Sequence, residues 1–306
     1  MVDKVEKIWM DGALIPWDAA QIHVLTHTLH YGLGVFEGIR CYKLDDGRSA
    51  IFRLDEHIRR LFDSARICTL PMPYDHATLV EACKATVREN GLDECYLRPL
   101  AFIGDGAMGL GARDNPTRVC VVAWRWGAYL GDDGIQNGIR AKISSFSRAG
   151  VNSLMAKGKV CGHYVNSILA KREALAAGYN EAIMLDPQGY VSEASGENIF
   201  VIRDGVVYTP ALGASILGGI TRDSVMRIMR DMGVRIVERP MGRDELYIAD
   251  EVFMVGTAAE VTPVREIDDR PVGKGTRGPI TAEVQDRYFK AVRGVNTPEP
   301  SWLDIV

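Results

Sequence analysis

Two stretches decide the fold of this chain, and they read Lys159-Val160-Cys161-Gly162-His163-Tyr164 and Tyr190-Val191-Ser192-Glu193-Ala194-Ser195-Gly196-Glu197-Asn198. The first places a lysine amine five residues before a phenol, and the second supplies a carboxylate at Glu193. Pyridoxal phosphate (PLP) uses an amine that bonds covalently to it, a phenol for its ring oxygen and a carboxylate that keeps its pyridine nitrogen protonated. The sequence therefore predicts a PLP enzyme that acts on amino groups.

The length and composition set the domain organisation. At 306 residues, 47% hydrophobic and 25% charged, the chain has the profile of a globular protein with room for two domains. We expect a small N-terminal α+β domain over residues 1–126, an interdomain loop over 127–138 and a larger C-terminal domain over 139–306 that carries the lysine. The loop is expected because residues 127–134 contain three glycines in Gly127, Gly131 and Gly134, and it would be mobile enough to cover a site.

Charge and cysteine usage exclude several classes of function. The net charge is −4 and the basic residues are dispersed, so we expect neither nucleic acid nor a membrane as a partner. The N-terminal residues 1–7 alternate in charge without an apolar stretch, which favours a cytoplasmic protein. Six dispersed cysteines form no Cys-x-x-Cys pair. His23, His27 and His30 could share a helical face as metal ligands, but the segment 21–25 alternates like a strand, and no metal site is predicted.

The hydrophobic periodicity predicts an α/β protein of the α+β type. In the first domain we expect strands over 7–9, 38–42, 50–53, 95–103 and 118–126, with a pair of helices over 56–70 and 77–90 on one face of the sheet. In the second we expect helices over 163–177, 221–232 and 280–292, and strands over 139–146, 181–185, 190–193, 199–202, 206–209, 234–239 and 251–255.

One segment imitates a dinucleotide-binding motif. Gly104-Asp105-Gly106-Ala107-Met108-Gly109 matches G-x-G-x-x-G and follows a predicted strand. A helix should open at the third glycine, but residues 110–116 contain another glycine and a proline. We therefore interpret the segment as a flexible loop.

Two glycine-containing turns suit a phosphate. Gly218-Gly219-Ile220-Thr221 precedes a predicted helix, so free backbone amides, the positive end of the helix dipole and a threonine hydroxyl can face an anion. Glycines before a threonine cap also occur in proteins that bind nothing. Gly256-Thr257-Ala258-Ala259 follows a predicted strand and permits close approach of a ligand to the backbone.

Several longer segments point to one family. They are His30-Tyr31-Gly32, Val35-Phe36-Glu37-Gly38-Ile39-Arg40-Cys41-Tyr42, Glu56-His57 with Arg60-Leu61, Tyr96-Leu97-Arg98-Pro99-Leu100, Trp126-Gly127-Ala128-Tyr129-Leu130-Gly131, Ser192-Glu193 with Gly196-Glu197-Asn198, Gly219-Ile220-Thr221-Arg222, and Ala249-Asp250-Glu251-Val252-Phe253 with Gly256-Thr257-Ala258-Ala259-Glu260. Together they resemble the branched-chain amino acid aminotransferases, PLP enzymes of fold type IV in the class IV aminotransferase family, with a D-amino acid aminotransferase-like fold. The matches run from about residue 8 to residue 302.

The resemblance implies a role for each matching cofactor residue. Lys159 would bond to PLP and then act as the general base that moves the substrate proton. Lys157 has the same strand parity, but only Lys159 has the family's spacing to Tyr164 and Glu193. Tyr164 would bond the ring oxygen and Glu193 the pyridine nitrogen. The remaining cofactor residues, which would hold the phosphate or line the ring, are Arg60, Gly196, Ile220, Thr221, Gly256 and Thr257.

The resemblance also implies a pocket that accepts two kinds of side chain, because the apolar side chain of leucine, isoleucine or valine alternates with the carboxylate of glutamate. Arg98 with Tyr31 would receive the distal carboxylate, and Tyr96 with residues 257–259 the α-carboxylate. The expected substrate residues are Tyr31, Phe36, Gly38, Tyr96, Arg98, Trp126, Tyr129, Thr257, Ala258 and Ala259. The expected partners are small amino acids and 2-oxo acids, exchanged by a ping-pong mechanism.

The resemblance further implies an oligomer and leaves rival activities. Family members are at least homodimers, with a hexamer as a larger form, and Met108 and Leu110 would reach into the neighbouring subunit's site. A D-amino acid transaminase or an aminodeoxychorismate lyase shares the fold, and a non-catalytic PLP-binding protein is a further alternative. Both related enzymes should lack the segments around Phe36 and Arg98. Two departures from the family pattern are Lys157 and Cys161 near the reactive lysine.

Overall fold

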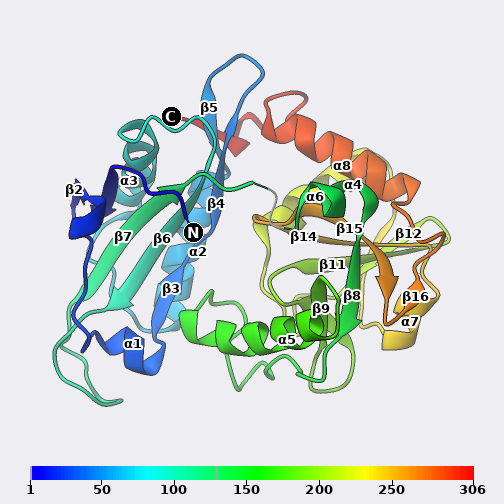
Figure 1. The fold of residues 1–306 in the computed structure, drawn as a ribbon, viewed down its shortest axis with the longest axis horizontal. Helices are drawn as coiled ribbons and strands as arrows, with labels where there is room; N and C mark the ends of the chain where they lie inside the picture. The colour runs from blue at the N-terminus through cyan, green and yellow to red at the C-terminus, as the bar shows by residue number, and fades with distance from the viewer. Residues whose placement is uncertain (1, 128–129) are drawn as a thin grey trace. The chain divides into compact units, whose positions relative to one another are not determined.

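The computed structural model describes residues 2–127 and 130–306, and the chain divides into two compact units. The first unit contains residues 1–126, 158–164 and 292–306, and the second contains residues 127–157 and 165–291. Each unit is built around its own sheet (Figure 1). Every strand pair described in the first sheet is antiparallel, whereas the second sheet also contains parallel pairs. The fold is thus a mixed α/β arrangement with two sheets, which confirms the predicted fold class.

The first unit contains an eight-stranded sheet in the order β17-β5-β4-β6-β7-β1-β2, with β3 paired to β6. Its elements are β1 (Lys7–Met10), β2 (Ala13–Pro16), η1 (Trp17–Ala19), α1 (His27–Tyr31), β3 (Gly34–Phe36), β4 (Ile39–Lys43), β5 (Ser49–Phe52), α2 (Leu54–Ile67), α3 (His76–Arg88), β6 (Cys95–Ile103), β7 (Thr117–Trp124), η2 (Cys161–His163), η3 (Pro300–Trp302) and β17 (Leu303–Ile305).

Local chemistry explains the helix pair α2 and α3. Helix α3 begins after Asp75, whose carboxylate accepts a hydrogen bond from the backbone N–H of Thr78 at 2.8 Å. Helix α2 buries Leu54, Ile58 and Leu61 at helical spacing, and these side chains pack with residues of α3 and of the sheet in one apolar core. The predicted helix pair on one face of a sheet is confirmed.

The second unit contains a nine-stranded sheet in the order β10-β9-β8-β15-β14-β11-β12-β13, with β16 paired to β15. Its elements are α4 (Asp132–Asn137), β8 (Ile139–Ile143), α5 (Tyr164–Ala176), β9 (Glu181–Leu185), β10 (Val191–Ala194), β11 (Asn198–Arg203), β12 (Val206–Thr209), α6 (Ile220–Asp231), β13 (Ile236–Glu238), α7 (Arg243–Tyr247), β14 (Glu251–Gly256), β15 (Glu260–Ile267), β16 (Arg270–Pro271) and α8 (Pro279–Val292). Tyr164, the first residue of α5, belongs to the first unit.

Most predicted elements are confirmed within three residues at each end. The segment 21–25 is not a strand, and the chain instead forms the short helix α1 from His27. The segment 104–116 forms no helix, as expected for a loop rather than a dinucleotide-binding turn. Within the expected interdomain loop over 127–138, residues 132–137 form the short helix α4, and the carbonyl of Ile135 accepts a hydrogen bond from Gln285 at 2.8 Å.

The segment with Lys159 groups with the first unit, although the sequence led us to assign it to the second domain. The cause is local bonding: Lys159 N donates to Ser64 Oγ at 3.0 Å, and Lys159 O accepts from Phe36 N at 3.1 Å. The C-terminal strand β17 likewise pairs with β5 of the first unit. The two-domain bounds stay a prediction, and the compact units cross them at these two segments.

Candidate active site

The reactive lysine predicted from the sequence lies beside its predicted phenol. Lys159 Nζ donates to the Tyr164 hydroxyl at 2.7 Å. The ring of Phe36 packs on the same pair, with its centroid 4.9 Å from that of Tyr164 and 5.1 Å from Lys159 Nζ. An amine within hydrogen-bond reach of a phenol and against an aromatic face is positioned for covalent chemistry at a half-buried site.

A buried carboxylate fixes the arginine that we expect at the phosphate. Glu37, fully buried, accepts two hydrogen bonds from Arg60, Nε at 2.7 Å and Nη2 at 2.8 Å, and lies 2.7 Å from His57 Nδ1. Burial opposes the ionisation of Glu37, but Arg60 and His57 outweigh it and hold the pKa of Glu37 well below its usual range. Burial lowers the pKa of His57, which favours a neutral imidazole that donates from Nδ1. The guanidinium of Arg60 is therefore held in one orientation.

Arg98 lies within an aromatic cage. Its guanidinium carbon is 4.7 Å from the ring centroid of Phe36, 5.5 Å from that of Tyr96 and 5.7 Å from that of Trp124. Its Nε is buried and has no hydrogen-bond partner among the residues that the structure describes. Because an unpaired buried donor is costly, this nitrogen suits an anionic ligand.

Gly38 contributes space at the same place. A Cβ at this position would lie 1.8 Å from the Tyr96 hydroxyl, so only glycine lets that hydroxyl approach the backbone. The ring of Trp126 packs edge-on against Tyr96 with centroids 4.7 Å apart. These residues form a continuous aromatic surface around Arg98.

In the second unit, hydrogen bonds hold both oxygens of Glu193. Oε1 is 2.8 Å from Arg148 Nη2, while Oε2 accepts from Asn198 Nδ2 at 3.1 Å and from Leu217 N at 3.0 Å. The side chain of Glu193 is 8% exposed. Donors of this kind stabilise the negative charge that a pyridine N–H would face.

The expected phosphate turns gather near this carboxylate. Helix α6 begins after Gly219, and a Cβ there would lie 2.0 Å from Asn198 Oδ1, the residue that also bonds Glu193. Gly256 lies against the carbonyl of Gly196, with 3.4 Å between that oxygen and a Cβ added at 256. The start of α6, the turn at 196 and the turn at 256–259 therefore share one end of the second sheet, where their amides suit an anion.

The amine of Lys157 is hydrogen-bonded to backbone carbonyls. Its Nζ donates to the carbonyl of Ile216 at 3.0 Å and to that of Leu212. Burial lowers the pKa of this amine and Glu193 partly opposes that shift. Through these two hydrogen bonds, Lys157 stabilises the segment 212–216, which precedes α6.

Glu197 is a second buried acid near Glu193. It accepts a hydrogen bond from Gly196 N at 3.1 Å, and burial, followed by the charge of Glu181, raises the pKa of Glu197 to about 8. Glu181 itself is fully buried and pairs with Lys171. At neutral pH Glu197 is therefore a protonated acid.

Replacing Glu197 by glutamine should flatten the pH dependence of stability. The unfolded chain releases this proton near pH 4.5 whereas the folded protein keeps it to about pH 8, so the free energy of unfolding falls as pH rises between these values. Glutamine removes that proton release. The Tm of Glu197→Gln minus the Tm of the wild type should therefore increase from pH 5 to pH 8. Thermal unfolding of the cofactor-free proteins measures it, with Glu283→Gln on α8 as control. A constant difference across this range contradicts the assignment.

The structure distributes the predicted residues over the two units. Those of the first unit are Lys159, Tyr164, Arg60, Tyr31, Phe36, Gly38, Tyr96, Arg98, Trp126, Met108 and Leu110. Those of the second are Glu193, Gly196, Ile220, Thr221, Gly256, Thr257, Ala258 and Ala259. The predicted substrate residue Tyr129 lies outside the described residues.

Sequence reasoning missed four residues that hold the site. Glu37, His57 and Asn198 lie inside segments that already carried the family resemblance, and their buried charge or amide in such a segment was a usable signal. Arg148 lies in no recognised segment, and only the folded chain reveals its pairing with Glu193.

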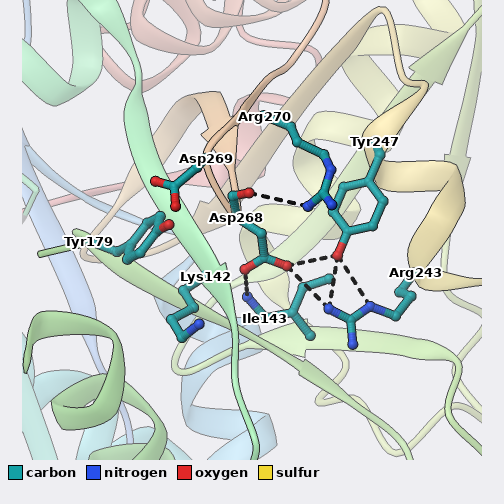
Figure 2. A pocket seen from close by; sticks show the side chains of 8 residues that line it. All are labelled: Lys142, Ile143, Tyr179, Arg243, Tyr247, Asp268, Asp269 and Arg270. Carbon is teal, nitrogen blue, oxygen red and sulfur yellow. Dashed lines mark hydrogen bonds and ion pairs between the residues drawn. The ribbon is translucent and has the colours of Figure 1, made fainter. Parts of the chain in front are cut away.

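A separate pocket of about 470 Å³ opens on the second unit, and no predicted site residue lines it. Figure 2 shows Asp268 at its centre, accepting hydrogen bonds from Tyr247 at 2.7 Å, Arg243 at 3.2 Å and the backbone of Ile143 at 3.0 Å. Because Asp268 is already satisfied by these neighbours, we assign no ligand to this pocket.

Two further findings concern metals and membranes. Over residues 2–127 and 130–306, no group of three or more His, Cys, Asp or Glu side chains is arranged to hold a metal ion. Within the same residues, no helix combines the length and apolar character needed to cross a bilayer.

The donor set fits PLP. The first unit presents an amine beside a phenol and an oriented arginine, and the second presents a carboxylate whose oxygens are held by N–H groups. The glycine at position 219 lets the side chain of Asn198, which bonds Glu193, pack against the start of helix α6. These are the groups that the ring, the aldehyde carbon and the phosphate of PLP require.

Comparison with known proteins places the chain in a family. The amino-transferase class IV model matches residues 34–267. The chain is 50% identical to the branched-chain-amino-acid aminotransferase of Pseudomonas aeruginosa, over 100% of this chain and 99% of that protein. The solved structure of the Escherichia coli branched-chain amino acid aminotransferase matches with a TM-score of 0.96 at 43% identity, over 98% of this chain and 99% of that one. That of the Thermobaculum terrenum branched-chain amino acid aminotransferase, in its PLP form, matches with a TM-score of 0.91 at 33% identity, over 98% of each chain.

The chain belongs to the class IV aminotransferase family, because the family model matches most of its length. The chemistry of the site agrees with this assignment. Its full-length relatives place it with the branched-chain-amino-acid aminotransferases of that family, and it is therefore a transaminase. The resemblance drawn from the sequence is confirmed.

Proposed function

We propose that the chain transfers amino groups reversibly between L-leucine, L-isoleucine or L-valine and 2-oxoglutarate, with PLP as cofactor and a ping-pong mechanism. The products are branched-chain 2-oxo acids and L-glutamate. One observation carries this proposal: the ring of Phe36 contacts the amine of Lys159 and the guanidinium of Arg98. A reactive amine and a cation for a second carboxylate are thus separated by one apolar ring.

The cofactor roles follow from the donors. PLP supplies the ring that accepts electrons when the substrate Cα loses its proton. Lys159 Nζ would hold the cofactor and act as the general base for the substrate's Cα proton, while Tyr164 would orient the ring oxygen. Glu193 would face the pyridine nitrogen. The proposed phosphate and ring contacts are Arg60, Gly196, Ile220, Thr221, Gly256 and Thr257.

The substrate roles follow from the aromatic cage. Phe36, Tyr96 and Trp126 provide apolar surface for a branched side chain, and Arg98 with Tyr31 receives the distal carboxylate of glutamate. The hydroxyl of Tyr96, which Gly38 admits to the backbone, would bind the α-carboxylate with residues 257–259. We also propose Tyr129 as part of this surface on the family's pattern. A pocket of this kind excludes neither substrate because each uses a different part of it.

A steady-state assay tests the proposal. The purified protein with added PLP should form L-glutamate from L-leucine and 2-oxoglutarate, with little turnover of D-alanine. Turnover of D-alanine alone would assign a D-amino acid transaminase. Formation of pyruvate and 4-aminobenzoate from aminodeoxychorismate would assign the lyase. Bound cofactor without any turnover would leave a binding protein.

We further propose that the enzyme is at least a homodimer, with a hexamer as a larger assembly. In the first unit Val24, Leu29 and Leu110 are 73%, 62% and 89% exposed. His27 holds the segment 24–29 against the loop 104–110. Its backbone N donates to Gly104 O at 3.1 Å, and its Nε2 lies 2.9 Å from Gly109 O. Exposed apolar side chains clustered in this way are typical of a protein contact.

Leu110→Asp should weaken the dimer and leucine binding together. A charge on the exposed tip of the 104–111 loop would be costly to bury in a subunit contact. Light scattering should show dissociation, and the KM for leucine should rise about tenfold or more because Met108 and Leu110 are proposed to act in trans. Asp105→Ala in the same loop serves as the control. An unchanged dimer with an unchanged KM contradicts the proposal.

A cytoplasmic location is also part of the proposal. The six cysteines are free thiols. Free thiols without disulfides are typical of a reducing compartment.

A further inference from the structure

We propose that Arg148 is a positioning residue for the cofactor's pyridine nitrogen: it holds the carboxylate of Glu193 in place and keeps it charged, so that the ring nitrogen rather than the glutamate carries the proton. This inference rests on the proposed binding of PLP beside Glu193. The observation that motivates it is the ion pair of 2.8 Å between Arg148 Nη2 and Glu193 Oε1.

Arg148 is itself held from several sides. Its side chain is 13% exposed, Nη1 is 3.3 Å from Ser167 Oγ on α5, and Nε is 3.5 Å from the carbonyl of Ser215. Its backbone N–H donates to the carbonyl of Leu185 at the end of β9 at 2.8 Å. The guanidinium therefore cannot follow the glutamate if that side chain moves, and it acts as a fixed point.

The two carboxylate oxygens of Glu193 have different partners. Oε1 contacts the guanidinium, and Oε2 contacts the amide of Asn198 and the backbone N–H of Leu217. An ion pair that is almost completely buried costs desolvation energy, which good geometry and further hydrogen bonds must offset. This pair has both, whereas a glutamate that only had to face a pyridine would not need a fixed cation beside it.

The charge of arginine determines where a shared proton resides. In an apolar site a pyridine and a carboxylic acid are favoured over the separated charges of pyridinium and carboxylate. A guanidinium that stays charged at every relevant pH reverses this preference, because it stabilises the carboxylate and makes it a weaker base. The proton then stays on the ring nitrogen, where it strengthens the ring as an electron acceptor.

Other charged groups near the pair act differently. The amine of Lys157 bonds to the carbonyls of Leu212 and Ile216, so it affects Glu193 through space alone. Glu197 is protonated at neutral pH, so it carries no charge that would repel Glu193. The structure places the guanidinium of Arg148 in contact with the carboxylate, and Lys157 is its matched control.

The test uses ¹⁵N NMR of the protein loaded with PLP labelled at the ring nitrogen. The wild type should show the chemical shift of a protonated pyridine. Arg148→Gln, which keeps a donor but removes the charge, should move the signal toward the unprotonated value and lower kcat roughly tenfold or more, with a smaller change in KM. Arg148→Lys should restore most of the shift, and Lys157→Met should leave it in place.

Each outcome decides between the proposals. An Arg148→Gln signal equal to that of the wild type, with only lower stability or cofactor affinity, overturns the role of Arg148 and leaves the proposed function intact. A wild type that forms no covalent cofactor band overturns the proposed function itself. If Arg148→Gln does not fold, a crystal structure of the wild type with PLP decides: Arg148 must remain within about 3 Å of Glu193, and its displacement contradicts the proposal.

Discussion

Lys159→Ala should lower kcat by about 10⁴-fold or more and abolish the visible absorption of covalently bound cofactor. The expectation has two physical reasons. The alanine variant lacks the amine that we propose bonds to PLP, and it lacks the proposed general base for the Cα proton, a role that alone contributes about 10²–10⁴-fold. The backbone bonds of residue 159, to Ser64 and Phe36, do not involve the amine, so the fold should be retained. Spectra and single-turnover kinetics with L-leucine measure both effects.

Lys157→Ala is the matched control for this result. Its amine bonds to backbone carbonyls at Leu212 and Ile216 rather than to Tyr164. The control variant should therefore keep the covalent absorption band, with a loss of a few degrees in Tm from the freed segment. If Lys157→Ala loses the band and Lys159→Ala keeps it, the two lysines have been assigned in the wrong order.

Arg98→Met is expected to separate the two half-reactions. The guanidinium, caged by Phe36, Tyr96 and Trp124, has a buried Nε without a partner among the described residues, and we propose that it receives the distal carboxylate of glutamate. Removing one member of a buried charge pair costs about 2–5 kcal/mol. The kcat/KM for glutamate should therefore fall about 10²–10³-fold, while that for leucine should fall less than about tenfold, since leucine offers no charge.

Pre-steady-state measurements of each half-reaction resolve this difference. Methionine keeps most of the bulk inside the aromatic cage, so a general collapse of the pocket is avoided. Arg118→Met provides a control on the neighbouring strand β7, where the arginine pairs with Asp11 at 2.6 Å. Equal losses for glutamate and leucine in Arg98→Met would remove Arg98 from the role proposed here.

The sequence predicted much of the fold because the local signals agree with the final structure. Strands β6 and β12 have the predicted bounds, and helix α3 begins at a genuine aspartate cap. Strand β15 was missed because Pro263 and the charged residues after it argue against a central strand. The structure accommodates this proline next to a register shift between Val264 and Glu266, a feature that no periodicity reveals.

Some contacts of the candidate site could likewise be predicted from the sequence, and others could not. The amine of Lys159 and the phenol of Tyr164 could be paired from their spacing, because both lie on one short segment. Arg148 could not, because its partner Glu193 is distant in sequence and the contact depends on how the second sheet folds. Lys157 looked equivalent to Lys159 in strand parity, and only the carbonyls around it show that it is used for structure.

The most direct test of the proposed function is the visible absorption spectrum of the purified protein before and after L-leucine is added without any 2-oxo acid. We predict a band of lysine-bound PLP that L-leucine converts to the pyridoxamine form and D-alanine does not. Absence of the band after addition of PLP would contradict the assignment of Lys159. Conversion by D-alanine alone would contradict the assignment of branched-chain L-amino acids as substrates.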